Sequence, residues 1–267
     1  MGVSVRDAYS QFRSWLRCER LHAMLHLLLH AAARSKVHSN NLFLLPNPFS
    51  VLSVISVVKI LPRKFYAQPT LQVARELLGA RLVRILDGVR LAGIIIEAEA
   101  YVGEEDLGCH AKSGKTKRNA VMYSPPGHAY VYFTYGNHWM LNAVTEQEEF
   151  PAAVLLRAIE PVEGVEIMLQ RRNGRDTLGP GKLAQALGID GAQNGIDLCT
   201  QDSGLWIEAG ETIPDAAVVT GPRVGLYSVP EPWKSIPWRF RTPPFDKLRA
   251  SPGPSPKAGG KQEKMIK

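Results

Sequence analysis

The chain has 267 residues, 45% of them hydrophobic and 21% charged, with a formal net charge of +7. This length permits one large domain or two small ones, and the composition is that of a globular protein with a sizeable core. The positive charge favours a polyanionic partner such as nucleic acid, although an anionic membrane surface would also fit.

Cysteine usage and hydropathy narrow the cellular setting. Cys18, Cys109 and Cys199 lie far apart and form no CxxC pair, which argues against a disulfide framework or a metal site. No apolar run approaches the roughly 18 to 20 residues of a membrane helix. We therefore expect a cytoplasmic protein with no membrane partner.

Three segments follow one another along the chain. Residues 1–63 form an extension, expected to be partly helical or poorly ordered, with a candidate amphipathic helix over about 5–34. Residues 64–241 carry regular turn signals and are expected to form the functional domain. Residues 242–267 form a basic tail rich in Pro, Gly, Ser and Lys, which is expected to be disordered because it can bury little apolar surface.

Strands precede and outnumber helices within the domain. Helical spacing of apolar residues predicts helices over 70–78, 163–172 and 182–187. Strands are expected over 81–86, 89–101, 130–134, 139–144, 153–159, 205–208, 217–220 and 223–225. Few helical crossovers separate these strands. The pattern therefore favours an α+β fold, a single compact domain with a curved, mainly antiparallel sheet, flanking helices and a protruding β-hairpin.

The strand at 94–103 carries an acidic pattern. Side chains alternate faces along a strand, so one face is apolar and the other presents Ile95, Glu97, Glu99 and Tyr101. Taken alone, this pattern is more typical of a half-exposed strand with solvated acids. The alternative is a packed strand that aims two carboxylates and a phenol into a site.

A hairpin at 129–139 is rich in aromatic residues. The Gly-Asn pair at 136–137 can adopt the positive φ of a tight turn, which leaves Tyr135 at or beside the tip. Packing within the sheet would explain Tyr130 and Tyr132. A tip aromatic has little to pack against in its own domain, and in a basic protein it can act as a wedge between base pairs.

Polar residues between and after these patterns complete a possible site. A solvated loop and a set of phosphate contacts explain the intervening cations equally well; these are Lys112, Lys115, Lys117 and Arg118. Asn142 and Arg157 stand in strands otherwise suited to burial, and buried polar groups need partners. A polar pocket that also contains Glu99 is the economical interpretation.

Two other enzyme classes fit less well. Glycoside hydrolases need carboxyl groups on opposite sides of a cleft, whereas Glu97 and Glu99 stand side by side, about 6–7 Å apart along one strand. Metal hydrolases need clustered ligands, and the chain shows no HExxH motif. Solvent exposure explains the histidines on one predicted helical face better than a metal site does; these are His22, His26 and His30.

A series of ordered motifs lies within residues 65–240. They are Phe65-Tyr66-Ala67-Gln68-Pro69, Ala74-Arg75-Glu76-Leu77-Leu78-Gly79, Glu97-Ala98-Glu99-Ala100-Tyr101, Asp106 to His110, Tyr130-Val131-Tyr132 with Tyr135-Gly136, Val154 to Pro161, Gly179-Pro180-Gly181-Lys182-Leu183 and Pro222-Arg223-Val224-Gly225. In this order the motifs resemble the 3-methyladenine DNA glycosylase family of the alkyladenine type. Residues 1–63 are not part of that family's core, and Cys109 stands where members often have a small residue.

The resemblance implies a base-excision repair enzyme that flips a damaged purine out of double-stranded DNA and hydrolyses its N-glycosidic bond. Its substrates would be alkylated or deaminated purines of the 3-methyladenine, 7-methylguanine and hypoxanthine type. The enzyme would be monofunctional, without metal or organic cofactor, and a monomer in a bacterial cytoplasm, associated with the nucleoid. The alternatives are a damage-recognition protein that binds DNA without cutting, and a protein directed at RNA.

The resemblance also implies a role for each site residue. Glu99 would activate the attacking water, and Arg157 would help to orient it. Tyr101, His110 and Tyr132 would enclose the flipped base, Asn142 would exclude the amino group of normal guanine, and Tyr135 would fill the gap in the duplex. Contacts with the DNA backbone would come from Lys112, Lys115, Lys117, Arg118 and Lys182.

Overall fold

The computed structural model describes residues 59–243. The expected helix at 5–34, its histidines and nearly all of the basic tail lie outside the described residues. The first described residues already join the sheet, because Leu61 donates its N–H to the carbonyl of Ile207 at 2.9 Å. At the other end, the N–H of Thr242 donates to the carbonyl of Ile96 at 2.9 Å.

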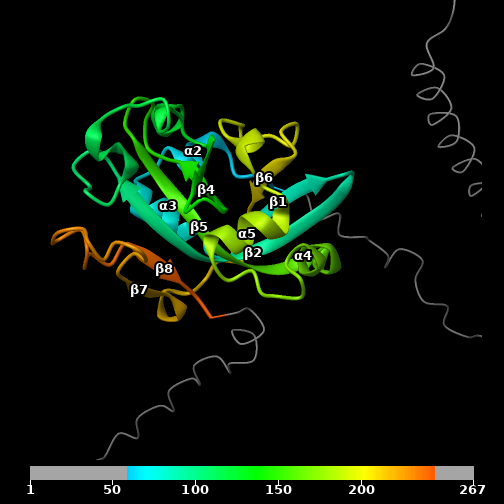
Figure 1. Cartoon of the computed structure of the whole chain (residues 1–267). Coiled ribbons are helices and arrows are strands. Elements are labelled where there is room, and N and C mark those ends of the chain that lie inside the picture. The colour runs from blue at the N-terminus through cyan, green and yellow to red at the C-terminus, as the bar shows by residue number, and fades with distance from the viewer. Residues whose placement is uncertain (1–58, 244–267) are drawn as a thin grey trace, which may run out of the picture. The chain divides into compact units, whose positions relative to one another are not determined.

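The described part of the chain is built on one eight-stranded sheet in which every ladder is antiparallel. The main path runs β3-β4-β5-β2-β1-β6, and β8 pairs with both β2 and β7. This confirms the expected α+β class, and Figure 1 shows the curvature of the sheet. The strands are β1 (Arg81–Leu86), β2 (Val89–Val102), β3 (Ala129–Thr134), β4 (His138–Val144), β5 (Ala152–Glu163), β6 (Leu205–Glu208), β7 (Val219–Gly221) and β8 (Arg239–Arg241).

Strand β2 is packed on both faces. Ile95 and Glu99, on the expected polar face, are as inaccessible as Ala98 and Ala100 on the other. The interpretation of a half-exposed strand with solvated acids is therefore wrong for Glu99. The reason is tertiary: a loop distant in sequence packs against the carboxylate, and its Val224 N–H donates to Oε1 of Glu99 at 2.7 Å. Strand β5 pairs along one edge of β2, and β1 and then β8 pair along the other.

The pairing of β2 with β5 is interrupted next to the acidic residues. The register shifts between Ile95 and Glu97 and again between Glu97 and Ala98. In the second shift Arg157 is the extra residue, with no partner opposite it on β2. Bulges of this kind re-aim side chains and often lie beside functional sites.

Helices α3 and α5 lie on the inner, concave side of the sheet (Figure 1). The ends of helix α5 follow the usual sequence preferences of helix termini. The helix begins with Pro180 at its first position and ends before Gly188, which lies in the left-handed region. Its buried residues share one core with those of α3 and the central strands. The α-helices are α2 (Arg63–Tyr66), α3 (Thr70–Glu76), α4 (Val165–Arg171) and α5 (Pro180–Leu187), and short 3-10 helices span His110–Ser113, Ala120–Tyr123, Gly191–Gln193 and Asp215–Ala217.

The structure departs from the sequence expectations at three places in the second half of the domain. The segment 223–225 is a loop, not a strand, because the N–H of Val224 donates to a carboxylate and Gly225 has φ +87°. Strand β8 was not expected. The helix expected from 163 starts later, because β5 continues to Glu163. Among the described helices, none has the length and apolar character required to cross a membrane.

Gly79 offers a test of the packing that supports β2. It has φ +90°, and a Cβ there would lie 2.1 Å from the carbonyl oxygen of Glu211. Gly88 also has a positive φ, +79°, but no atom would lie within 4 Å of its Cβ. We expect Gly88→Ala to lower the free energy of unfolding by about 1–2 kcal/mol through backbone strain, and Gly79→Ala by about 3 kcal/mol or more through strain and collision. Urea unfolding measures both, and equal losses would contradict the packing.

Candidate active site

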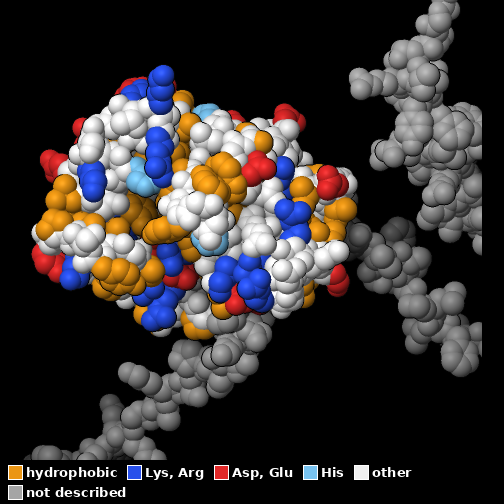
Figure 2. Space-filling model, in the orientation of Figure 1, with side chains coloured by type: hydrophobic (Ala, Val, Ile, Leu, Met, Phe, Trp, Pro, Cys, Tyr) orange, Lys and Arg blue, Asp and Glu red, His pale blue; other side chains and the backbone are white. Residues whose placement is uncertain are grey.

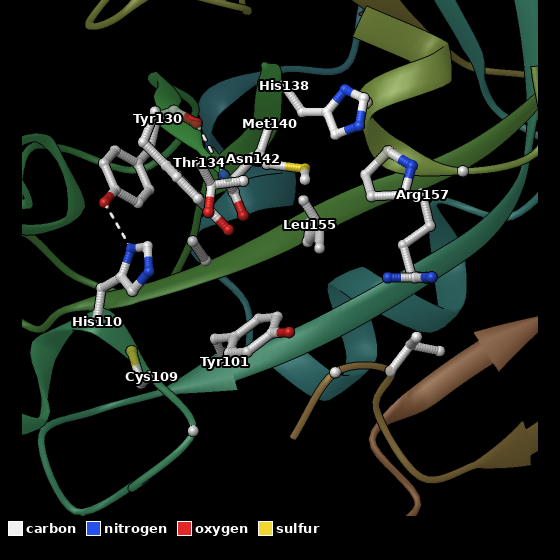
Figure 3. Close-up of a pocket in the computed structure, with 18 of the residues that line it drawn as sticks. Tyr101, Cys109, His110, Tyr130, Thr134, His138, Met140, Asn142, Leu155 and Arg157 are labelled. Carbon is white, nitrogen blue, oxygen red and sulfur yellow. Dashed lines mark hydrogen bonds between the residues drawn. The ribbon is translucent and has the colours of Figure 1, made fainter. Parts of the chain in front are cut away.

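A cavity of about 410 Å³ lies between the β3–β4 hairpin, strands β2 and β5, and the start of α5. This volume falls in the range of small-ligand sites. In Figure 3, Tyr101 lies on one side of the cavity opposite Asn142 and Met140, with His110 at one end and Arg157 at the other. The labelled side chains around it are Tyr101, Cys109, His110, Tyr130, Thr134, His138, Met140, Asn142, Leu155 and Arg157.

Glu99 lies behind this cavity. Its side chain is wholly buried, and the cavity is lined by its neighbours instead of by Glu99 itself. The hydroxyl of Tyr101 donates to Oε2 at 2.9 Å, and the N–H of Val224 donates to Oε1 at 2.7 Å. Both donors belong to residues that line the cavity. The carboxylate is therefore held from two sides just beneath the cavity wall.

Arg157 joins the two acidic residues of β2. Its Nε lies 3.0 Å from Oε1 of Glu97 and 3.3 Å from Oε1 of Glu99. Glu97 has a second partner in Arg239, whose Nη1 lies 3.6 Å from Oε1 of Glu97. Of these two arginines, Arg157 is the one that lines the cavity. The structure thus brings together Glu99 and Arg157, the pair that the sequence analysis placed in one polar pocket.

Burial sets the protonation behaviour of the site. Desolvation raises the pKa of Glu99 above its ordinary value, against the lowering effects of Arg157, the Val224 N–H and the Tyr101 hydroxyl. Burial, followed by the charge of Glu99, raises the pKa of Tyr101 well above its usual range, so its hydroxyl remains a hydrogen-bond donor. A carboxylate with a raised pKa is suited to accept a proton near neutral pH.

Aromatic residues form the walls where a planar ligand could stack. The His110 and Tyr132 rings have centroids 4.4 Å apart, and Nδ1 of His110 lies 2.9 Å from the Tyr130 hydroxyl. Desolvation, with the nearby charges of Arg118 and Lys112, lowers the pKa of His110, which favours a neutral imidazole.

Asn142 is fixed between the hairpin and the sheet. It is buried, and its amide nitrogen donates to the carbonyl of Tyr130 at 2.9 Å. Its side chain lines the cavity. This anchoring holds the amide in one orientation, so that its position relative to a bound ligand is defined.

Tyr135 occupies the tip of the hairpin. It is 80% exposed, and it lines the mouth of the cavity. The turn differs from the expected one: Tyr135 and Gly136, not Gly136 and Asn137, have positive φ, at 52° and 70°. The N–H of Asn137 closes the turn on the carbonyl of Thr134 at 3.3 Å. The ring lies at the mouth of the cavity, where a Cβ on Gly225 would be 3.9 Å from its hydroxyl.

The predicted phosphate-binding cations divide into two groups. Lys112, Lys117 and Arg118 are exposed, and Arg118 also lies 5.9 Å from the ring centre of Tyr132. Lys115 and Lys182 form surface ion pairs of 2.9 Å with Glu149 and Asp176. Such pairs are weak, so a phosphate could compete for either lysine. Figure 2 shows Lys and Arg side chains spread over the displayed face of the domain.

Sequence reasoning gave no role to several residues of the site. Val224 contributes through its backbone N–H, which no side-chain pattern reveals. Asp106 and Arg223 form a buried ion pair beside Tyr101. Both residues stand in motifs on which the family resemblance rests, but the sequence assigned neither of them a role. Across residues 59–243, no group of three His, Cys, Asp or Glu side chains is arranged to hold a metal ion.

Comparisons with known proteins identify the class. A model of the methylpurine-DNA glycosylase (MPG) family matches residues 64–244. A relative from Methanocella arvoryzae, named "Putative 3-methyladenine DNA glycosylase", is 48% identical over 187 residues, which cover 68% of this chain and 91% of the relative. Relatives of the same name from Chlorobaculum parvum and Myxococcus xanthus are each 46% identical, over 68% and 73% of this chain and 87% and 95% of their own lengths.

The matches and the site together define a DNA N-glycosylase, a hydrolase of DNA repair. The chain belongs to the methylpurine-DNA glycosylase family.

The raised pKa of Glu99 predicts a pH-dependent stability difference. A carboxyl group whose pKa is higher in the folded than in the unfolded protein binds more protons when folded, so stability falls as pH rises from the unfolded to the folded pKa. Glu99→Gln removes this loss. We expect its free energy of unfolding, relative to that of the native sequence, to increase from about pH 4 toward neutrality in urea titrations. A difference that shrinks with rising pH would show that the carboxylate is net stabilised.

Proposed function

We propose that the enzyme excises alkylated or deaminated purines of the 3-methyladenine, 7-methylguanine and hypoxanthine type from double-stranded DNA, with Glu99 activating the water. The observation that carries the proposal is the position of Glu99, which lies wholly buried behind an aromatic cavity of about 410 Å³. A carboxylate held there serves no purpose in binding a polyanion, but it suits a reaction that generates positive charge.

The chemistry requires a base and an electrostatic partner. The water oxygen forms a bond to the anomeric carbon of the sugar as the N-glycosidic bond breaks, and its proton passes to Glu99. The electrons of the broken bond leave with the purine, so a cationic alkylated purine departs as a neutral molecule. Oε2 of Glu99 accepts one described hydrogen bond, from the Tyr101 hydroxyl, and keeps a second lone pair for water. Arg157, at 3.3 Å from Oε1, orients that water.

Base recognition follows from the walls of the cavity. The flipped purine stacks between Tyr101 and His110, with Tyr132 against the histidine. The anchored side chain of Asn142 excludes the amino group of undamaged guanine. Tyr135 enters the duplex and replaces the lost stacking of the extruded base. The exposed cations Lys112, Lys117 and Arg118, with Lys115 and Lys182, bind DNA phosphates.

Excision tests the function directly. Duplexes containing hypoxanthine, or methylated with an alkylating agent, should yield strand breaks at the lesion after incubation and alkali treatment. No breaks should form without alkali, because no amine is proposed as the nucleophile. Binding without breaks would instead indicate a damage-recognition protein, and breakage without alkali would indicate a second, lyase activity.

The role of Glu99 is separable from that of its neighbour. Glu99→Gln should reduce excision by about 10²–10⁴-fold while lesion binding is retained, because shape is preserved and the base is lost. Glu97→Gln is the matched control, since Glu97 also pairs with Arg157 but is partly exposed. Single-turnover excision and gel-shift binding measure both properties. Similar losses in the two variants would remove Glu99 from the catalytic role.

The wedge role of Tyr135 predicts weaker lesion binding in Tyr135→Ser. Stacking of one base on an aromatic ring is worth about 1–3 kcal/mol, so the dissociation constant should rise by roughly 5- to 150-fold. Tyr135→Phe keeps the ring and should bind like the native sequence. Because the side chain is 80% exposed, neither change should lower the unfolding temperature. Native affinity in the serine variant would contradict insertion.

A further inference from the structure

Behind Tyr101, on a wall of the base cavity, lies a buried ion pair. Arg223 and Asp106 both have side chains with no exposed surface, and Nη2 of Arg223 donates to Oδ1 of Asp106 at 2.8 Å, alongside a second bond from Nη1 to Oδ2. The guanidinium carbon lies 4.6 Å from the ring centre of Tyr101. Tyr101 lines the cavity and Arg223 does not. The Tyr101 ring therefore separates the cavity from the guanidinium.

Arg223 also has a structural role, because its Nη1 and Nη2 donate to the carbonyls of Ala100 and Trp233 at 3.0 and 3.4 Å. That role does not by itself account for the buried charge. Buried ion pairs can often be replaced by apolar residues without loss of stability. Nε of Arg223 is also buried and has no hydrogen-bond partner among the described residues, so the guanidinium carries an uncompensated cost. Trp238 covers it at 5.1 Å on another side, which keeps it dry. The buried charge of Arg223 interacts strongly with neighbouring charges, because water does not screen it.

Asp106 is held so that it neutralises this charge. Its carboxylate accepts the N–H of Gly108 at 2.9 Å and that of Val102 at 3.3 Å, in addition to the guanidinium. The pair thus presents almost no net charge to the back of the Tyr101 ring. If Asp106 were neutral, a full positive charge would lie behind the surface on which the purine stacks.

We infer that Asp106 is a specificity-determining residue: by cancelling the charge of Arg223 behind Tyr101, it allows the cavity to accept positively charged purines as well as neutral ones. The inference rests on the proposed function, in which Tyr101 stacks on the flipped base. Purines methylated at N7 or N3 are cationic in DNA, whereas hypoxanthine is neutral. An uncancelled guanidinium would repel the former. It would also favour departure of the latter, which gains negative charge as its bond breaks.

The test compares excision of 7-methylguanine and hypoxanthine in the same duplex context, as the ratio of their kcat/KM values. A base stacked on Tyr101 would place its charge roughly 9 Å from the guanidinium, which at an effective dielectric constant of about 20 corresponds to a factor of about twenty. Asp106→Asn should therefore lower the ratio of 7-methylguanine to hypoxanthine excision by about tenfold or more. General damage to the fold would lower both rates together and leave the ratio unchanged, which would overturn the inference.

Variants of Arg223 supply the controls. In Arg223→Met the remaining carboxylate either keeps its charge or takes up a proton, and neither state repels a cationic base, so the ratio should equal or exceed that of the native sequence. The double variant Asp106→Asn/Arg223→Met should restore the ratio lost in Asp106→Asn. Should Asp106→Asn fail to fold, a lowered ratio in Arg223→Met would overturn the inference by itself. If the native enzyme excises neither lesion, the proposed function fails instead.

Discussion

The enclosure of one carboxylate inside strand β2 is the constraint on which the rest of the site depends. A buried charge is costly unless donors surround it, and Glu99 receives them from three places. Tyr101 stands two residues along the same strand, Arg157 comes from a bulge in β5, and the Val224 N–H comes from a distant loop. No single element forms the site. It exists only when the sheet has closed around β2, so folding and catalytic competence are coupled.

Charge around the cavity is organised in layers. In the wall of the cavity, Arg157 is shared by two carboxylates that lie behind it, Glu97 and Glu99. Behind Tyr101, a second arginine is matched by its own carboxylate. The cavity surface itself is mostly aromatic and apolar, with an imidazole whose lowered pKa favours the neutral form. A cationic base bound in the cavity would thus meet the π-electron density of its aromatic walls.

The site residues could be predicted from the sequence where the pattern that marks them is local. The alternation of side chains along β2 placed Glu99 and Tyr101 on one side of the strand. Gly136 placed the hairpin turn to within one residue of its observed position. What it could not supply was tertiary. The Val224 N–H and Glu99 are 125 residues apart, and Arg223 and Asp106 are 117 apart. The bulge at Arg157 depends on how two strands pair, and the left-handed conformation of Tyr135 contradicts the usual preference for Gly or Asn there.

That conformation has a consequence for engineering and for evolution. A tyrosine at φ 52° is a poor local choice, and asparagine would fit the same backbone with less strain. Selection for heat resistance alone would therefore tend to replace the ring at this position. If Tyr135 enters the duplex as proposed, variants selected for stability alone would lose that ring and bind damaged DNA less tightly.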